Sequence, residues 1–412
     1  MKCVLIIGDG LGDRPLKELN WKTPLQVAKK EAIDEIAEKG VCGIMDPIAP
    51  GIPPGSDTSH LAIFGYDPFK VYTGRGVFEV LGAGLNMLPG DIGFRCNFAT
   101  VDENMVVVDR RAGRNIEDAD ELAEALNGIK LKNYPDVQVI FKHTTEHRCA
   151  MILRGKNLSS SISDTDPEAI GVRVHDVKPL DHSPEAARTA EVLNEATKEF
   201  HEILKSHPIN AKRKAFGLPQ ANIVLSRGAS VLPQIKPLTE IYGVKALAVV
   251  PNALIRGITS LVGMDQIDVA GATGTVDTNT IAKAKAVIAN LALYDFFFVH
   301  VKGSDNASHD GDLQKKIKMI EKIDMLVRYI LDHVSLDETI IALTADHTTP
   351  INVKEHTGDP VPLAIVGAGV RRDYVKVFSE VDCAHGGLCR IRGADLMPTL
   401  MNYLGKCKKF GE

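Results

Sequence analysis

The sequence predicts an α/β protein, in which a domain with a mostly parallel sheet is interrupted by a smaller inserted α/β domain. First, the apolar runs at residues 2–7, 295–301 and 339–345 have the composition of strands buried on both faces of a parallel sheet. Second, segments of helical period separate the strands. Third, residues 71–232 differ in character and gather positive charge, so we assign residues 1–70 and 233–412 to the first domain and 71–232 to the insert.

Composition narrows the classes of protein. The chain has 412 residues, 44% of them apolar, which suits two to three domains with a large core. A net charge of −5 and a pI near 6.2 argue against nucleic acid as the main partner. We find no run of 18 apolar residues and no signal peptide, and we expect a cytoplasmic protein without a membrane partner. Seven scattered cysteines without a Cys-x-x-Cys indicate reduced thiols.

The first 70 residues predict two strands and two helices. The strand at residues 2–7 is followed by a helix over 24–39, with Thr23 as its N-cap, Pro24 in its first turn and Gly40 as its stop. A second strand is expected at 41–45. A Pro/Gly loop then leads to a short helix that begins at or just after Ser56.

The insert contains strand-like runs at 136–142, 148–154 and 221–225, and a helix from 184 to about 205. Its arginines and histidines could bind an anionic substrate, although ordinary surface charge explains any single one of them. The candidates for substrate binding are Arg75, Arg110, Arg111, Arg114, His143, His147 and Arg148.

The resumed first domain supplies the remaining elements. We expect strands at 244–250, 295–301, 339–345 and 361–366, and helices at about 312–333 and 393–403. A Gly/Thr loop at 271–279 contains a Gly-x-x-Gly, which is weak evidence for phosphate binding and fits a simple connection better.

Carboxylates follow three of the predicted strands. Asp9, Asp305 and Asp346 each come at or shortly after a strand end, and parallel strands bring their carboxyl ends to one edge of the sheet. Histidines that could ligate a metal accompany them: His309, His347 and His356. Asp305 and His309 are one helical turn apart and can reach the same metal.

Each stretch alone also fits a loop-capping aspartate beside surface histidines. Their joint occurrence at strand ends favours a metal centre, and six ligands plus a serine fit two metals better than one.

Ser56 is the candidate nucleophile. A serine at a helix N-terminus, near metals, can lose its proton and attack phosphorus in a phosphate held by the exposed N–H groups. The alternative is that Ser56 only caps the helix, as most serines in this position do. Ser59 is a rival nucleophile by sequence, but one turn further on it should point along the helix.

These motifs resemble those of the alkaline-phosphatase-like metalloenzymes and, more closely, the cofactor-independent phosphoglycerate mutases of archaeal type. The resemblance covers nearly the whole chain. It rests on IGDG (7–10), GSDTSHL (55–61), LAIFGYDP (61–68), YTGRG (72–76), DNASH (305–309), TADH (344–347) and HT (356–357). Bacterial-type mutases have a serine four residues before a histidine, which matches Ser56 and His60. Their longer chains carry substrate-clamping arginines that do not map cleanly onto this insert.

The resemblance implies a three-layer alkaline-phosphatase-like domain with two divalent metals. One metal would be held by Asp305, His309 and His356. The other would be held by Asp9, Ser56, Asp346 and His347. Mixed Asp/His ligation suits manganese, zinc or cobalt better than magnesium.

The implied reaction interconverts 2- and 3-phosphoglycerate, as in glycolysis and gluconeogenesis, without bisphosphoglycerate and through a phosphoserine at Ser56. The insert would bind the substrate and act as a lid that excludes water. Alternatives with the same metal core are a metal-dependent phosphomonoesterase and a sugar-phosphate mutase acting on, for example, phosphopentose. A catalytically dead binding module would require loss of the nucleophile or of several ligands, and all are present. Nothing in the sequence predicts an oligomeric state.

Overall fold

The chain folds into two compact units in a computed structural model that describes residues 1–409 and 411. Unit 1 consists of Met1–Tyr72 and the residues from Ile235 on, and unit 2 of Thr73–Gln234. Unit 2 is therefore one continuous insertion into unit 1.

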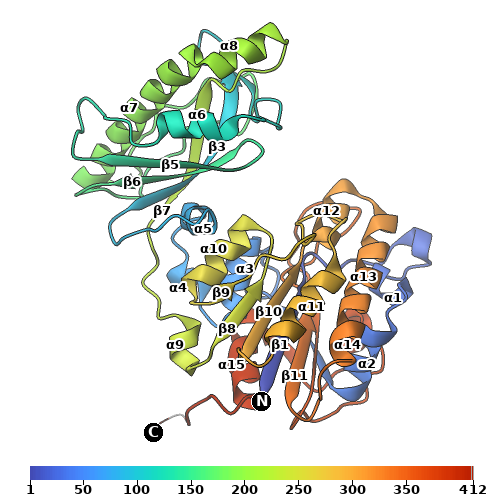
Figure 1. The fold of residues 1–412 in the computed structure, drawn as a ribbon. Helices are drawn as coiled ribbons and strands as arrows, with labels where there is room; N and C mark the ends of the chain where they lie inside the picture. The colour runs from blue at the N-terminus through green and yellow to red at the C-terminus, as the bar shows by residue number, and fades with distance from the viewer. Residues whose placement is uncertain (410, 412) are drawn as a thin grey trace. The chain divides into compact units, whose positions relative to one another are not determined.

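The sheet of unit 1 confirms the predicted mostly parallel α/β fold (Figure 1). Its order is β13-β2-β12-β11-β1-β10-β8-β9, and among these strands only β12 runs opposite to the rest. Each of β1, β10 and β11 is almost wholly buried, as the apolar runs predicted, and β12 is buried as well. The strands are β1 (Lys2–Gly8), β2 (Val41–Asp46), β8 (Ala246–Val249), β9 (Asp265–Gln266), β10 (Phe296–Val301), β11 (Thr339–Thr344), β12 (Val361–Val366) and β13 (Cys389–Arg392).

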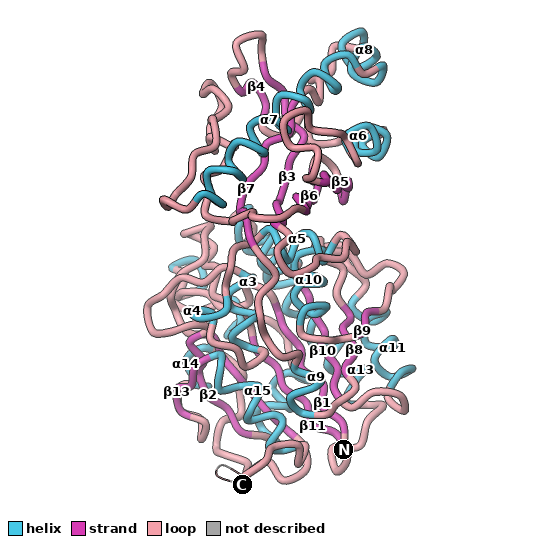
Figure 2. The backbone as a smooth tube through the Cα atoms, turned by 90° about the vertical axis from the view of Figure 1, so that its left-hand side faces the viewer, coloured by secondary structure: helices cyan, strands magenta, loops and turns pink. Residues whose placement is uncertain are grey.

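Helices cover both faces of this sheet, which gives three layers (Figure 2). Helices α2, α11 and α13 pack together, and α3 packs with α10 and α15. In the part of the chain that is described, no helix is long and apolar enough to cross a bilayer. The helices are α1 (Pro24–Val27), α2 (Glu31–Lys39), α3 (Ser56–Ile63), α4 (Pro68–Val71), α9 (Leu238–Tyr242), α10 (Ala253–Leu261), α11 (Thr280–Asn290), α12 (Gly303–Asp310), α13 (Leu313–Leu331), α14 (Glu380–Cys383) and α15 (Gly393–Tyr403), with a short 3-10 turn at Lys17–Leu19.

The single helix predicted over residues 24–39 is wrong. The backbone becomes extended at Ala28, and α2 starts afresh after Lys30. Acidic side chains from α13 accept hydrogen bonds from this region: Asp324 accepts from the Ile33 N–H at 2.8 Å. Tertiary contacts of this kind override the local helical preference.

Unit 2 is built on an antiparallel sheet. Strands β4, β6 and β7 all pair with β3, and β5 pairs with β6. Helix α7 begins at residue 184 as predicted, and Ser183 caps it by accepting from the Ala186 N–H at 3.1 Å. The elements are β3 (Ile92–Val101), β4 (Val107–Asp109), β5 (Gln138–Thr145), β6 (Arg148–Arg154), β7 (Ile223–Ser230), α5 (Gly76–Gly82), α6 (Ala119–Leu126), α7 (Pro184–Ser206) and α8 (Pro208–Ala215).

Candidate active site

Three neighbouring parallel strands bring the predicted carboxylates together. β1 lies between β10 and β11, and Asp9 and Asp346 follow β1 and β11 at the same edge of the sheet. Asp305 lies in the first turn of α12, directly after β10. Gly10 lets the β1 loop approach α12 closely, because a Cβ at this position (φ +64°) would lie 2.8 Å from the Cα of Asp305.

The first group of potential ligands surrounds Asp305. Its Oδ1 lies 3.3 Å from Nε2 of His309, one turn further along α12, and 3.5 Å from Nε2 of His356. Each histidine donates its Nδ1–H to a backbone carbonyl, His309 to Lys354 at 2.7 Å and His356 to Pro54 at 2.8 Å. Nε2 of each histidine therefore faces the carboxylate and is the nitrogen that would bind a metal, as in histidine ligands whose other ring nitrogen is held by a carbonyl.

The second group surrounds His347. Its Nε2 lies 3.3 Å from each of three oxygens: Oγ of Ser56, Oδ1 of Asp9 and Oδ2 of Asp346. The two carboxylate oxygens are buried without a hydrogen-bond donor among the described residues. Buried acceptors that face one another repel unless a cation lies between them, so these residues fit a divalent metal.

The ligand groups overlap at His347. Asp305, His347 and His356 can converge on one ion, and so can Asp9, Asp346 and His347. The rings of His347 and His356 stack with centroids 3.5 Å apart. The structure thus brings together all seven residues predicted to hold metals.

Ser56 is the first residue of α3, where the backbone N–H groups are not used within the helix. The rival hydroxyl, that of Ser59, is buried and donates back to the Ser56 carbonyl at 3.2 Å. It is therefore engaged along the helix, as predicted. His60 also donates its Nδ1–H to that carbonyl, at 2.6 Å.

Lys302 is a charged member of the centre that the sequence analysis missed. Its Nζ lies 3.1 Å from Oδ2 of Asp9 and 2.8 Å from Oδ2 of Asp305. Burial alone would lower the pKa of Lys302, but these carboxylates outweigh it and raise the pKa above its usual value. The feature of the sequence that could have indicated Lys302 is its position one helical turn before Asp305.

The surroundings shift the pKa values of Asp305 and Asp346 in opposite directions. Burial would raise the pKa of Asp305, but hydrogen bonding to its two histidines and the charge of Lys302 lower it. Burial, and then the charge of Asp9, raise the pKa of Asp346. Hydrogen bonding to Asp305 also raises the pKa of His309 to about 9, so without a metal a proton adds to the positive charge of Lys302 at this carboxylate cluster.

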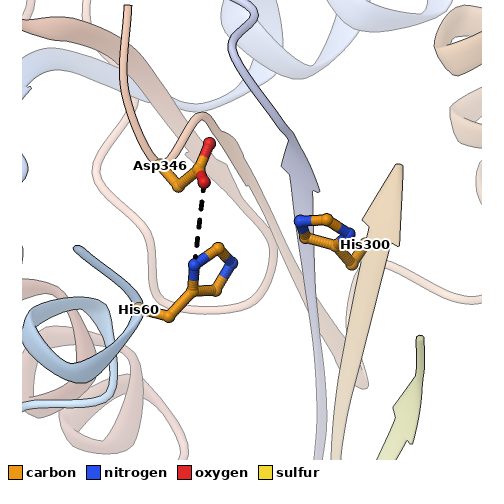
Figure 3. A group of neighbouring side chains, drawn as sticks. All are labelled: His60, His300 and Asp346. Carbon is orange, nitrogen blue, oxygen red and sulfur yellow. Dashed lines mark ion pairs between the residues drawn. The ribbon is translucent and has the colours of Figure 1, made fainter. Parts of the chain in front are cut away.

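Two buried histidines lie beside Asp346, and only His60 carried a sequence signal, through its spacing from Ser56 (Figure 3). His60 Nδ1 is 3.7 Å from Oδ2 of Asp346, and Nε2 of His300, on β10, is 3.1 Å from Oδ2 of Asp9. Burial lowers the pKa of His60 to about 4 and also lowers that of His300. Both are neutral near pH 7 and add no positive charge.

A separate pocket of about 290 Å³ in unit 2 is lined by arginines, namely Arg75, Arg95 and Arg227, with Asp164 and Gly228. The register of the sheet sets Arg95 on β3 directly opposite Arg227 on β7. Arg148 on β6 pairs with Asn97, two residues further along β3. Arg95 and Arg227 are absent from the predicted set, because only the strand register brings them together.

Two of these guanidinium groups have acidic partners, because Arg75 donates to Glu79 at 3.1 Å and Arg227 to Glu168 at 3.0 Å. Nε of Arg95 and Nε of Arg148 are buried and have no hydrogen-bond partner in the described chain. Burial, followed by the charge of Arg75 and other nearby arginines, lowers the pKa of Arg95 to about 10. The carboxylate nearest to Arg95, that of Glu79, is 3.7 Å away. Such a pocket suits an anionic ligand.

The other predicted substrate-binding residues have different surroundings. Arg110 forms a bidentate pair with Asp166, Arg114 bonds Glu146, and His143 bonds Asp120, while Arg111 is exposed. His147 is buried, and burial followed by the charge of Arg148 lowers its pKa to about 4, so that it is neutral.

Known proteins similar to this chain decide its family. A family model described as 2,3-bisphosphoglycerate-independent phosphoglycerate mutase matches residues 37–210. The curated enzyme of that name from Methanothermobacter thermautotrophicus is 49% identical over 412 residues, covering 100% of both chains. The one from Methanocaldococcus jannaschii is 50% identical over 411 residues, covering 100% of this chain and 99% of its own. The chain belongs to this family.

Solved structures agree with the family in overall fold. A Pyrococcus horikoshii protein is 41% identical, with a TM-score of 0.87, over 100% of this chain and 99% of its own. The cofactor-independent phosphoglycerate mutase from Thermoplasma acidophilum is 36% identical, with a TM-score of 0.74, over 98% of this chain and 99% of its own. As a phosphoglycerate mutase the chain is an isomerase, which confirms the resemblance inferred from its motifs.

Proposed function

We propose that this enzyme interconverts 2-phosphoglycerate and 3-phosphoglycerate by passing the phosphoryl group through Ser56. The observation that carries the proposal is the convergence of Ser56 Oγ, two carboxylates and His347 Nε2 at 3.3 Å. Asp305, His309 and His356 would hold one divalent ion. The other would be held by Asp9, Ser56, Asp346 and His347. Manganese, zinc and cobalt match this mixed donor set better than magnesium.

The proposed reaction has two steps, one to and one from Ser56. Bound divalent ions would supply positive charge that favours the serine alkoxide and the phosphoryl oxygens. Ser56 Oγ gives up its proton and forms the new bond to phosphorus while the bond to the glycerate oxygen breaks, and that oxygen takes up one proton in exchange. The free N–H groups at the start of α3 favour the phosphoryl charge. The other glycerate hydroxyl then attacks phosphoserine, losing its proton and releasing Ser56.

Unit 2 is proposed as the substrate-binding unit and lid, and unit 1 as the metal-binding phosphatase-like unit. In unit 2 we favour Arg75, Arg95, Arg148 and Arg227 as the groups that bind the anionic substrate. Arg75 and Arg227 also bond carboxylates, but they line the pocket. Arg110, Arg114 and His143 have acidic partners and are not among its lining residues, and His147 is neutral. We expect the reaction to take place in the cytoplasm.

Phosphorus NMR tests this function directly. The chelator-stripped enzyme, reloaded with manganese and given 3-phosphoglycerate without bisphosphoglycerate, should form 2-phosphoglycerate and no free phosphate. Without added metal, turnover should be at background. Ser56→Ala should lose turnover by about a thousandfold or more, because the group that accepts phosphorus is gone.

Ser59→Ala is the matched control, because it removes a buried hydroxyl three residues away that bonds only the Ser56 carbonyl. It should retain most activity. Free phosphate in place of 2-phosphoglycerate would point to a phosphomonoesterase, and a panel of sugar phosphates would then be tested. Full activity in Ser56→Ala would refute the proposed nucleophile.

A further inference from the structure

Thr349 lies between the two groups of ligands. It belongs to the loop after β11 and is fully buried. Its hydroxyl donates to Oδ1 of Asp305 at 3.0 Å, on the side of the first group. The same oxygen is 2.9 Å from Nδ1 of His347, the centre of the second group.

The hydroxyl of Thr349 fixes the tautomer of His347. A threonine hydroxyl has one hydrogen, and here the Asp305 carboxylate, which can only accept, takes it. The Thr349 oxygen must therefore accept from His347, whose Nδ1 carries the proton. Nε2 of His347 is left bare and faces Asp9, Asp346 and Ser56. Such a second partner sets the tautomer and orientation of a histidine ligand.

The backbone of Thr349 is itself held in place. Nζ of Lys316, on α13, donates to the carbonyls of Thr349 and Gly12 at 2.9 Å each and pairs with Asp13 at 2.8 Å. The Thr349 N–H also donates to the Gly12 carbonyl, at 3.3 Å. Because Lys316 and Asp13 are buried, the hydroxyl of Thr349 can shift little relative to the β1 loop.

We propose that Thr349 is a positioning residue that couples the two metal sites. The inference rests on the two-metal centre proposed above. An ion bound at Asp305 fixes that carboxylate, which orients the Thr349 hydroxyl, and the hydroxyl orients His347 for the second ion. Binding at one site therefore strengthens binding at the other. Asp305 belongs only to the first proposed ligand set and His347 only to the second, so the coupling passes through Thr349.

Calorimetric titration of the stripped full-length enzyme with Mn²⁺ tests the coupling. Wild type should bind two ions with positive cooperativity. Thr349→Val should weaken both sites by about 10- to 100-fold, the usual effect of losing a partner of a metal ligand, and should bind the ions independently. Thr349→Ser retains the hydroxyl and should restore both features.

Thr344→Val is the matched control. Thr344 is also fully buried, at the end of β11, but its hydroxyl donates to the Pro362 carbonyl at 2.8 Å and contacts no ligand. It should lose stability without losing metal affinity. If Thr349→Val binds two ions as wild type does, or if only one of its sites weakens, the coupling is refuted. One ion per wild-type chain would instead refute the two-metal centre, and with it the coupling.

A second measurement needs no variant. Nitrogen-15 NMR of the zinc-loaded wild-type enzyme should show His347 protonated at Nδ1 and zinc-bound at Nε2. A His347 protonated at Nε2 would refute the role of Thr349, whatever the activity of the enzyme.

Discussion

The metal centre of unit 1 and the arginine pocket of unit 2 both gather charged groups, but they do so in opposite ways. In the metal centre most ligands have a second partner: Asp305 is held by Thr349 and Lys302, His309 and His356 donate to carbonyls, and His347 donates to the Thr349 hydroxyl. One oxygen each of Asp9 and Asp346 is left without a donor among the described residues. In the pocket, Arg95 and Arg148 keep buried nitrogens without partners. The hydrogen bonds of the metal centre thus stabilise unit 1. In the pocket of unit 2, repulsion among the arginines lowers stability but leaves their guanidinium groups available to bind an anion.

The largest expected effect comes from breaking the network behind the metal centre. Lys316→Met removes the cation that bonds Asp13 and two backbone carbonyls, and leaves a buried carboxylate unpaired. The free energy of unfolding should fall by about 3–5 kcal/mol. Urea denaturation of the stripped protein measures it.

The neighbouring residue provides the control. Lys315 pairs with Asp312 on the surface of the same helix, and Lys315→Met should leave the stability almost unchanged. Adding Asp13→Leu to Lys316→Met should recover part of the loss, since it removes the stranded charge. Equal losses for the two lysine variants would mean that the buried network does not stabilise unit 1.

Removing an arginine from the pocket should have the opposite effect on the free energy of unfolding. Arg95→Met removes a mostly buried guanidinium that lies among like charges. Stability should stay unchanged or rise by about 0.5–2 kcal/mol, while kcat/KM for phosphoglycerate falls by about tenfold or more. Manganese affinity, measured by calorimetry, should not change.

Arg114→Ala sharpens this comparison, because Arg114 is exposed and already bonded to Glu146. It should change kcat/KM by less than about threefold, in keeping with its exposed ion pair. A larger loss of kcat/KM in Arg114→Ala than in Arg95→Met would mean that the substrate binds to the residues first predicted from sequence and not to the pocket.

The smallest expected effect concerns the pH dependence of unit 2. Burial and Arg148 lower the pKa of His147 from its usual 6.5 to about 4. Between these values the unfolded chain binds a proton that the folded one does not, so stability is complete above about pH 6.5 and falls as pH drops toward 4. Hydrogen exchange of β6 should show this loss, and His147→Gln should flatten it. A steeper loss in the variant would contradict the assignment.

The convergence of the candidate metal ligands could be predicted from sequence because each stands in a simple relation to a buried element. Asp9 and Asp346 follow apolar strands, and His309 is one turn after Asp305 on the same helix. The three-layer fold follows from the same strands. The orientation of β12, by contrast, depends on pairing with both β2 and β11, which no local pattern records.

The missed residues are those whose role depends on a distant partner. Lys302 resembles any polar residue after a strand until Asp9 is placed beside it. Arg227 acquires its meaning only through the register that sets it opposite Arg95. The break at Ala28 depends likewise on packing against α13. Local sequence therefore predicted which candidate ligands lie together, but not which other side chains surround them.

The position of β1 has a consequence for the biosynthesis of the chain. This first strand is central, and its partners β10 and β11 are the tenth and eleventh strands to emerge. At about 5–20 residues per second, an apolar segment at the very start waits roughly 15–70 s for them. The continuous residues of unit 2 complete their own sheet in the meantime. During synthesis the apolar strand β1 therefore stays unpaired after unit 2 has folded. We expect such a nascent chain to bind ribosome-associated chaperones.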